Sequence, residues 1–551
     1  MLAVAVLFLI ANRGAFKGYF SADDLNNLAW TSHAAPMDWV EGLLTPRFSE
    51  ANYRPTGHFV YCVLGKTFGL DFRPFVWLIQ VLHLANVGLL WFLLRKFGAE
   101  RKGAITAALL FAFHMACFDA YWKPMYVFDL LACFWVLITL LLYTGRTWWT
   151  GLLTFWLAYK SKEIAVALPA FLAAYEYFVG GRRWLRVVPY AAISAWFTVQ
   201  ALAQVATKRT SYTLQFTPEA FLKTLSFYSS EILFVPYAGL AFVFVYFIVK
   251  DKWIRLGVAG TALLMGPLWF LPERMFSVYL YLPLVGAAIA VAFASQRWRV
   301  WVIATLFAVW IPYNYMVMRE KRKAALAIAD ENRPYVQAIG RLHAALPELR
   351  TILYESRPEH LPVWGVEGAF QWFYRSPDLK LADAGTDAAR GLFGGKGLAV
   401  VGWVAAGQRM PVTLRDPSRP EASRIRIGEA APVWLLGDGW MWAGGAFRWT
   451  RPRATAELHR PAGARFFEVA LYVSPLQLKD QGSVTVEPVV DGEPLGVKRF
   501  TREGWHTERW PVRAGDEKMV AIELRFPAPY RPAGHEGEPF GATVGGFGFA
   551  E

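Results

Sequence analysis

Charged residues are scarce in this sequence. Only 18% of its 551 residues are Asp, Glu, Lys or Arg, whereas 55% are hydrophobic and the mean hydropathy is +0.28. Soluble proteins carry about 25% charged and about 45–50% apolar residues. This many apolar residues cannot all be hidden in a water-soluble core. The composition therefore excludes a soluble enzyme, a disordered chain and a fibrous protein.

Cysteines are almost absent as well. The three that occur, Cys62, Cys117 and Cys133, all lie in the apolar first half. The polar C-terminal part has none, so it cannot depend on a disulfide bond even in an oxidising compartment. There is no zinc-finger spacing and no RNP-like stretch. We therefore expect no nucleic-acid partner, although the formal net charge is +14.

Apolar segments long enough to approach a membrane crossing follow one another through the first half. A bilayer core of about 30 Å needs about 20 helical residues, with shorter runs where the flanking residues extend to the interface. The first stretch lacks the cationic start of a signal peptide, so we interpret it as a span and leave open whether residues precede it. About eleven spans are predicted, at 1–15, 75–94, 104–120, 127–143, 148–159, 164–179, 187–205, 232–249, 256–271, 276–293 and 300–317.

Short basic clusters between these segments predict the orientation, because cytoplasmic loops are enriched in Lys and Arg. Four clusters, at 95–102, 182–186, 250–255 and 297–299, are expected on the cytoplasmic side. This requires 54–70 to be a juxtamembrane helix rather than a span. The N-terminus is then cytoplasmic and everything after Val317 is outside. The basic residues at 319–323 disagree with this assignment.

Polar residues gather at the side that this topology makes the outer face. Ionisable side chains at membrane depth are costly and therefore indicate function. Two adjacent acids, followed by cations from separate helices, suit a reaction in which a carboxylate deprotonates a hydroxyl while cations hold a phosphate leaving group. The candidates are Asp23, Asp24, Tyr53, Arg54, His58, Asp119, Lys123, Lys162, Glu163, Glu273 and Arg274.

Each candidate also has a purely structural interpretation. Asp23 and Asp24 lie where an amphipathic helix is expected to begin, and acids stabilise a helix N-terminus. Arg54 and Lys123 are typical of cations that extend to a membrane interface. In this interpretation the others are local ion pairs or packed side chains: Lys162 with Glu163, Glu273 with Arg274, and His58.

The order of short motifs along residues 1–320 resembles a known family. The motifs are Asp23-Asp24, Tyr53-Arg54-Pro55, His83 with Asn86, His114 with Asp119 and Trp122, Ser161-Lys162-Glu163, and Glu273-Arg274 ahead of Tyr281-Leu282-Pro283. This series resembles the GT-C superfamily of polytopic glycosyltransferases. The closest likeness is to protein O-mannosyltransferases, including the branch that usually carries tetratricopeptide repeats. In that family an acidic pair in the first outer loop supplies the general base, the donor is a sugar on a polyprenyl phosphate, and many members need no metal.

The resemblance implies roles for individual residues. Asp23 is the expected general base, with Asp24 as the second choice. Glu163 is expected to orient Lys162, and Asp129 resembles an acidic position that follows the third span of the mannosyltransferases. The donor phosphate is expected to contact Arg54, Lys162 and Arg274, and the rest of the substrate site is expected at Tyr53, His58, Asp119, Lys123 and Glu273.

The family comparison leaves the acceptor open. No MIR-like insertion and no 34-residue repeat is present, so either a glycan or a protein remains a candidate acceptor. The expected partners are a polyprenyl-phosphate-linked sugar, that acceptor and the lipid bilayer. We expect no cofactor. No His, Asp and Glu residues occur at the spacing of metal ligands. The sequence nevertheless leaves open whether a divalent ion assists the acids.

The polar half is expected to contain a connecting region and a β-sandwich. Apolar residues recur at helical spacing over 324–349, and the runs 351–354 and 398–401 predict buried strands of a small α/β piece. Further strands are predicted at 466–473, 484–490, 498–500, 508–512 and 519–526, with the glycines at 545–548 in turns. The segment 490–496 resembles jelly-roll carbohydrate-binding modules. The predicted domains are a GT-C-like membrane domain (1–322), a helix with a small α/β region (323–430) and a jelly-roll-like sandwich (431–551).

Three classes of function are open from the sequence. The leading one is an inverting glycosyltransferase at the outer face of the cytoplasmic membrane. A non-catalytic scaffold of envelope glycan assembly would instead bind glycan through sandwich tryptophans such as Trp440 and Trp505, although such rings also fill cores. A lipid-linked sugar flippase or another carrier would place its charges at mid-membrane in broken spans, often with inverted repeats, and no repeat is found.

Overall fold

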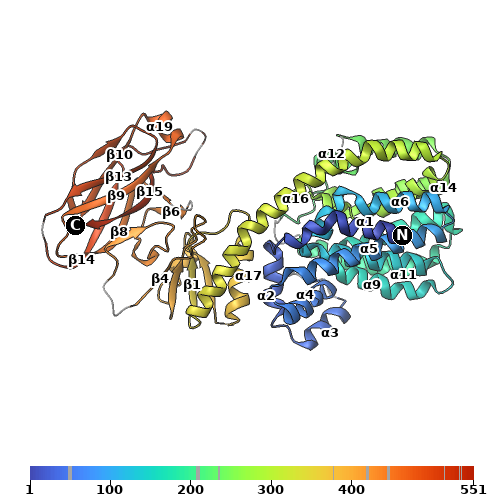
Figure 1. Cartoon of the computed structure of the whole chain (residues 1–551), viewed down its shortest axis with the longest axis horizontal. Coiled ribbons are helices and arrows are strands. Elements are labelled where there is room, and N and C mark those ends of the chain that lie inside the picture. Colours follow the sequence, from blue (N-terminus) through green and yellow to red (C-terminus); the bar gives the residue numbers. More distant parts are fainter. Residues whose placement is uncertain are drawn as a thin grey trace. The chain divides into compact units, whose positions relative to one another are not determined.

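The computed structural model of the chain divides into two compact units, Met1–Asp330 and Glu331–Glu551 (Figure 1). The residues that it describes are 1–46, 53–205, 211–233, 236–376, 378–416, 421–443, 447–513, 515–532, 534 and 536–551. We describe each unit by itself and call them unit 1 and unit 2. Because unit 2 includes residues from both predicted C-terminal domains, the limits 1–322, 323–430 and 431–551 stay a prediction.

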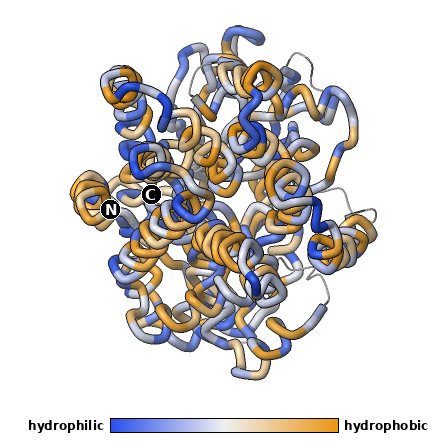
Figure 2. The backbone as a smooth tube through the Cα atoms, turned by 90° about the vertical axis from the view of Figure 1, so that its right-hand side faces the viewer, coloured by the Kyte–Doolittle hydropathy of each residue, from blue (hydrophilic) through white to orange (hydrophobic). Residues whose placement is uncertain are grey.

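Unit 1 is helical, and its helices are largely hydrophobic (Figure 2). Its α-helices are α1 (Leu2–Asn12), α2 (Ala22–Thr31), α3 (Pro36–Leu44), α4 (Pro55–Phe68), α5 (Phe72–Lys96), α6 (Arg101–Phe113), α7 (Phe118–Trp122), α8 (Val127–Tyr143), α9 (Gly151–Ser161), α10 (Leu168–Tyr175), α11 (Val188–Val205), α12 (Pro218–Leu233), α13 (Ala241–Ile248), α14 (Lys252–Leu264), α15 (Leu284–Ser295) and α16 (Val300–Ala345). Short 3-10 and π helices join several of them.

Within the described residues, four helical segments are long and apolar enough to cross a membrane: Phe72–Lys96, Pro124–Tyr143, Glu163–Gly180 and Val300–Ala345. Two bent pairs raise the number to as many as six. They are Leu2–Lys17 with Ala22–Thr31, bent by 79°, and Arg101–Phe113 with Met115–Trp122, bent by 43°. Unit 1 is therefore a polytopic membrane unit. The predicted number of about eleven spans is not confirmed, and the predicted orientation stays a prediction.

Local sequence predicted some helices well and failed at others. The segment 127–143 is α8, and 54–70 contains α4, as expected. The predicted span 232–249 is wrong, because α12 ends at Leu233 and the next short helix begins at Ala238. Pro236 has no backbone N–H, and Tyr237 has a φ of 60°, so the chain turns here instead of continuing a helix.

The last predicted span and the helix expected after it are one element. α16 has 46 residues and runs through the basic stretch at 319–323 without a break. The boundary between the two units falls inside this helix. The basic stretch is therefore helical, and its side chains take fixed positions along one helix.

The first part of unit 2 is a four-stranded sheet in the order β2-β1-β3-β4. Its strands are β1 (Thr351–Tyr354), β2 (Lys380–Asp383), β3 (Leu398–Val401) and β4 (Val412–Leu414), with helices α17 (Val363–Tyr374) and α18 (Asp387–Arg390). β1 is parallel to both neighbours, and β4 is antiparallel to β3. The strands expected at 351–354 and 398–401 are confirmed, and every residue of both is buried.

The rest of unit 2 is a sandwich of two antiparallel sheets. One sheet has the order β11-β10-β14-β8, with β12 on β10, and the other has the order β13-β9-β15-β7-β6, with β5 on β15. The inner side chains of both sheets share one core, which includes Leu458, Leu524, Phe467 and Leu471. The strands are β5 (Arg424–Arg426), β6 (Trp440–Ala443), β7 (Arg448–Thr450), β8 (Arg453–Arg460), β9 (Phe466–Val473), β10 (Val484–Val490), β11 (Glu493–Pro494), β12 (Lys498–Phe500), β13 (Gly504–Pro511), β14 (Lys518–Arg525) and β15 (Thr543–Ala550).

The strands predicted at 466–473, 484–490 and 498–500 have the bounds of β9, β10 and β12. The turn expected at 545–548 is wrong, because these residues belong to β15, which lies between β9 and β5. A Cβ at Gly548 would come within 2.4 Å of the Arg424 backbone. Glycine is therefore present here so that β5 can approach, and it does not mark a turn.

Candidate functional site

Asp23 and Asp24 lie in the first turn of α2, but their side chains meet different surroundings. The backbone N–H of Ser21 donates to Asp24 Oδ2 at 2.9 Å, which completes a capping box. The Tyr61 hydroxyl on α4 donates to Asp24 Oδ1 at 2.5 Å, and Asp24 is fully buried. Asp23 is partly exposed. Asp24 therefore ties α2 to α4, and Asp23 is the acid of the pair that solvent reaches.

Arg54 and Glu163 form a bidentate ion pair between segments far apart in the sequence. Arg54 Nε donates to Glu163 Oε1 at 3.0 Å, and Nη2 donates to Oε2 at 2.9 Å. Arg54 is the N-cap of α4, and Glu163 begins the 3-10 helix that follows α9 after Lys162. The pair uses one edge of the guanidinium, and the remaining N–H donors of an arginine point elsewhere. The pair thus fixes Arg54 while leaving donor capacity for a further anion.

Lys162 is bound by Asp129 and not by its neighbour Glu163. Lys162 Nζ donates to both carboxylate oxygens of Asp129, at 2.7 and 2.6 Å, and lies 4.7 Å from the centre of the Tyr279 ring. The Lys162 side chain is 13% exposed and that of Asp129 is 4% exposed. The expected role of Glu163 in orienting Lys162 is therefore corrected: Asp129 takes that role, and Glu163 holds Arg54.

Asp119 holds two lysines from different elements. Lys123, the residue that follows α7, lies 2.8 Å from Asp119 Oδ1, and Lys321 of α16 lies 3.8 Å from Oδ2. Lys321 Nζ also donates to the Ser277 hydroxyl at 2.8 Å. Lys321 was not among the sequence candidates. Its signal was the basic stretch at 319–323, which disagrees with the predicted topology.

Glu273 and Arg274 do not act as a local ion pair. Glu273 lies 3.4 Å from Lys223, and both side chains are more than half exposed. The Arg274 guanidinium lies 3.9 Å from the centre of the Tyr212 ring, and its Nη1 donates to Ser211 Oγ at 3.4 Å. In the ion pairs that the described residues make, Arg274 has no carboxylate partner. It is the cation best placed to accept an added phosphate.

Tyrosines connect these pairs into one cluster. The charges of Asp23, Arg54 and Arg274 all act on Tyr212. Those of Asp23, Asp119 and Asp129 act on Tyr126. The members other than Lys321 lie near helix ends or in the segments between helices. The predicted residues that this cluster includes are Asp23, Arg54, Asp119, Lys123, Asp129, Lys162, Glu163 and Arg274.

Two of the predicted substrate residues have packing contacts. His58 is buried, accepts from the Arg54 backbone N–H at Nδ1 and lies 3.2 Å from Asn27 Oδ1 at Nε2. The Tyr53 ring stacks on His58 with a 6° angle between the planes, and its hydroxyl donates to the Asp38 carbonyl oxygen at 3.2 Å. These contacts join α2, α3 and α4 behind the cluster, and a direct role of either residue in substrate binding stays a prediction.

The family-like motif of His83, Asn86 and Tyr281 forms a buried hydrogen-bond network. The Tyr281 hydroxyl lies 2.7 Å from His83 Nδ1 and accepts from Asn86 Nδ2 at 3.2 Å. The second ring nitrogen of His83 lies 3.1 Å from the Ala112 carbonyl oxygen. All three side chains are almost fully buried. The network joins α5, α6 and the segment before α15, so its role is to hold the helices that carry the cluster.

One group of possible metal ligands lies in unit 2 and outside this cluster. Ligand atoms of Glu331, Glu359 and His360 lie within 4.8 Å of one another, and two of the three residues are exposed. His360 Nδ1 already lies 3.0 Å from Glu331 Oε2. Exposed acids gather in this way on many protein surfaces, so we assign no metal to the group.

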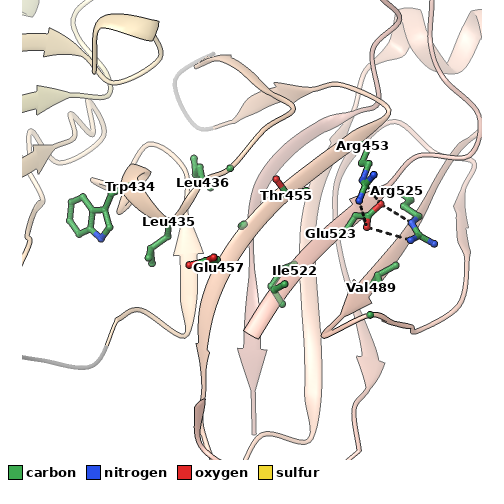
Figure 3. Close-up of a pocket in the computed structure, with 14 residues that line it drawn as sticks. Trp434, Leu435, Leu436, Arg453, Thr455, Glu457, Val489, Ile522, Glu523 and Arg525 are labelled. Atoms are coloured by element: carbon green, nitrogen blue, oxygen red, sulfur yellow. Dashed lines mark hydrogen bonds and ion pairs between the residues drawn. The ribbon is translucent and has the colours of Figure 1, made fainter. Parts of the chain in front are cut away.

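A cavity of about 550 Å³ lies on the sheet that contains β8, β14 and β10 (Figure 3). Glu523 forms ion pairs with both Arg453 and Arg525, whose Nε atoms lie 2.7 and 2.8 Å from Glu523 Oε1. Apolar side chains, among them Leu435, Leu436 and Val489, form much of the remaining lining. Both arginines of the cavity are thus already paired with Glu523.

No protein-family model and no curated protein matches the sequence. The chain is similar to the solved structure of ArnT from Cupriavidus metallidurans bound to undecaprenyl phosphate, with 13% identity and a TM-score of 0.45 over 76% of this chain and 97% of that chain. ArnT in the apo state gives 15% identity and a TM-score of 0.45, over 72% of this chain and 92% of that chain. Arabinosyltransferase EmbB from Mycobacterium smegmatis gives 12% identity and a TM-score of 0.34, over 99% of this chain and 64% of that chain. At these identities and TM-scores, the similarity assigns no activity to this chain.

Proposed function

We propose that the chain is a membrane glycosyltransferase that moves a sugar from a polyprenyl phosphate to an acceptor on the outer face of the cytoplasmic membrane. The observation that carries this proposal is the partly exposed Asp23 in a cluster of cations, in which Arg274 has no carboxylate among the described ion pairs. A base beside a site for an anion is what transfer from a phosphate to a hydroxyl requires. The likeness to protein O-mannosyltransferases stays a prediction.

In the proposed reaction, the carboxylate of Asp23 takes the proton of an acceptor hydroxyl. The hydroxyl oxygen attacks the anomeric carbon of the sugar from the face opposite the phosphate. The bond between that carbon and the phosphate oxygen breaks, and its electron pair stays on the phosphate. One displacement of this kind inverts the anomeric configuration. The reaction balances without a redox partner.

The cations have a specific task in this step. Negative charge grows on the departing phosphate, and donors that are already positioned stabilise it without reorganising. Asp129 and Glu163 hold Lys162 and Arg54 in place. Arg274 rests on the Tyr212 ring, a contact that keeps its N–H groups available. We expect the donor phosphate to bind Arg274 directly. We expect it also to contact Lys162 and Arg54, which keep their ion pairs with Asp129 and Glu163.

The proposal is tested with purified protein and a panel of radiolabelled polyprenyl-phosphate sugars. Release of free polyprenyl phosphate from one donor, with transfer of label to a water-soluble or lipid acceptor, is the expected result. The donor that reacts identifies the sugar. Release from no donor by folded protein contradicts the proposal.

One observation favours a second candidate, a scaffold that binds envelope glycan through the sandwich. Of the two tryptophans expected to bind glycan, Trp440 stacks on the buried Phe547 at 5.2 Å and packs against the core. Trp505 is 52% exposed on the outer face of a sheet. A scaffold would need Trp505 but not Asp23, so substitutions at these two positions distinguish the candidates.

A further inference from the structure

The outer face of the sheet formed by β13, β9 and β15 carries a row of aromatic side chains. Trp505 lies opposite Tyr472, Tyr472 opposite Thr543, and Thr543 opposite Trp449 of β7. The Tyr472 and Trp505 ring centres are 5.5 Å apart, and Phe447 stacks on Tyr472 at 5.9 Å. Thr543 is buried and the Trp449 ring packs against Tyr530 and Phe540, whereas Trp505 is 52% exposed. Trp505 is therefore the ring of this row that is most open to a ligand.

A row of charged side chains crosses β13 and β9 at Glu468, four residues before Tyr472. Arg509 lies opposite Glu468, Glu468 opposite Gly548, and Gly548 opposite Arg424 of β5. Arg509 Nε donates to Glu468 Oε2 at 2.9 Å, and Arg424 Nη2 donates to Oε1. Because Gly548 has no side chain, Arg424 reaches Glu468 across β15. The Arg509 side chain is 60% exposed and that of Glu468 only 5%, so the arginines are the groups that solvent meets.

Short side chains separate the two rows. Thr507 lies opposite Ala470, and Ala470 opposite Gly546, whose partner on β5 is Arg426. Arg426 lies 3.7 Å from Glu429. Glu468 and Glu429 together offset two of the three arginines of this face. One net positive charge therefore remains beside the aromatic row.

We propose that this face binds a polysaccharide whose sugars carry carboxylate groups. The C–H faces of sugar rings pack against flat aromatic rings that are exposed on one side, which Trp505 offers. Carboxylates suit the forked donors of arginine, and the excess of one arginine gives the face the complementary charge. Trp505 and Arg509 lie four residues, or about 13 Å, apart along β13. This distance is longer than one sugar ring, which favours a chain over a free monosaccharide.

The cavity of Figure 3, on the other sheet, is a poorer choice for such a ligand. Its two arginines and two glutamates cancel in charge. Its tryptophan, Trp434, has the Arg415 guanidinium 5.9 Å from its ring centre and donates its Nε1–H to Glu421 at 3.0 Å. The aromatic face that a sugar needs is thus already in contact with protein. The two sheets of the sandwich therefore differ in what they offer to a glycan.

That this polysaccharide is the acceptor of the transfer rests on the proposed function, whereas the binding does not. The test uses the full chain in lipid nanodiscs and measures the Kd for polygalacturonate oligosaccharides, with dextran of similar length as the neutral comparison. Polygalacturonate is expected to bind and dextran to bind at least tenfold more weakly. Trp505→Ala is expected to weaken polygalacturonate binding at least tenfold, and Trp505→Phe to restore part of it.

The matched control is Trp364→Ala, since Trp364 of α17 is 51% exposed and lies outside the sandwich. Arg509→Gln is expected to weaken polygalacturonate binding and to reduce its dependence on salt. No binding of polygalacturonate, equal binding of dextran, or equal losses in Trp505→Ala and Trp364→Ala would each overturn the proposal. If no donor is cleaved but the Trp505-dependent binding is found, the proposed function fails and this inference stands.

Discussion

The charged cluster of unit 1 and the outer sheet face of unit 2 use the same residue types in opposite ways. In unit 1, the carboxylate on Lys162 is only 4% exposed and comes from a distant segment. On the sheet, the Glu468 carboxylate is just as buried, with 5% exposed, but its partners Arg424 and Arg509 are 32% and 60% exposed, whereas Lys162 is 13% exposed. Buried pairs are costly to form and to break, whereas exposed pairs contribute about 0–1 kcal/mol. The first arrangement suits charge that develops in a reaction, and the second suits reversible binding.

A large effect that separates the two regions is expected at Arg274. Arg274→Gln removes the one phosphate candidate without a carboxylate partner in the described ion pairs. Loss of one such donor is expected to lower the transfer rate by about 10²–10³-fold. The control is Lys223→Gln, which removes an exposed cation that pairs with the adjacent Glu273. Equal rates in wild type and Arg274→Gln would remove Arg274 from the site.

A second contrast concerns stability inside unit 1. Asp24→Asn replaces one of two fully used carboxylate oxygens by an NH₂ group, which leaves the donor of Tyr61 or Ser21 without an acceptor. An unsatisfied buried donor costs about 1–3 kcal/mol. We expect a lower unfolding temperature for Asp24→Asn in detergent. Asp23→Asn is the matched variant, and an equal loss in both would contradict the different roles of the two acids.

Much of the fold follows from local sequence, and much of the site does not. The apolar run of α8 and the strands β9, β10 and β12 have the predicted bounds, because periodicity is a local property. The pair of Arg54 with Glu163 joins residues 109 positions apart. Adjacency in sequence suggested Lys162 as the partner of Glu163. Only the packing of α4, α8 and α9 decides between these partners.

Two other differences between the sequence predictions and the structure have the same origin. The glycines of β15 look like a turn until the approach of β5 is known. Lys321 looks like a topological exception until Asp119 and Ser277 are seen beside it. In both cases the deciding contact comes from a segment that is distant in sequence. Residue type and spacing predicted which acids and cations belong to the candidate site, but they did not predict which of them pair.

A moderate effect is expected at Lys321. Lys321→Gln leaves Asp119 with Lys123 alone and removes one positive charge from the cluster. We expect the donor KM to rise about tenfold, equivalent to about 1.4 kcal/mol, with little change in kcat. Steady-state kinetics with the reactive donor measures both constants. Arg319→Gln, two residues earlier on the same helix, is the control, and the same change in both variants would count against a specific role of Lys321.

The smallest effect is a pH dependence of the sandwich. Burial alone would raise the pKa of the Glu468 carboxyl, but hydrogen bonds from Arg424 and Arg509 outweigh it and hold that pKa below the usual 4.5. The stabilisation is thus present above pH 4.5 and is lost as the pH falls through the lower folded-state pKa. Glu468→Gln is expected to remove this part of the acid destabilisation, worth up to about 1 kcal/mol. Unfolding curves of both proteins between pH 3 and pH 7 (a range chosen about the usual Glu pKa) would reveal it, and parallel curves would contradict it.

The central claim is that Asp23 is the base and that Asp24 is structural. The most direct measurement is single-turnover transfer from the reactive donor by wild type, Asp23→Asn and Asp24→Asn, each corrected for the folded fraction. Loss of a general base lowers a rate by about 10²–10⁴-fold. We predict this loss for Asp23→Asn at an unchanged unfolding temperature, and a much smaller loss per folded molecule for Asp24→Asn. Full activity of folded Asp23→Asn would contradict the mechanism.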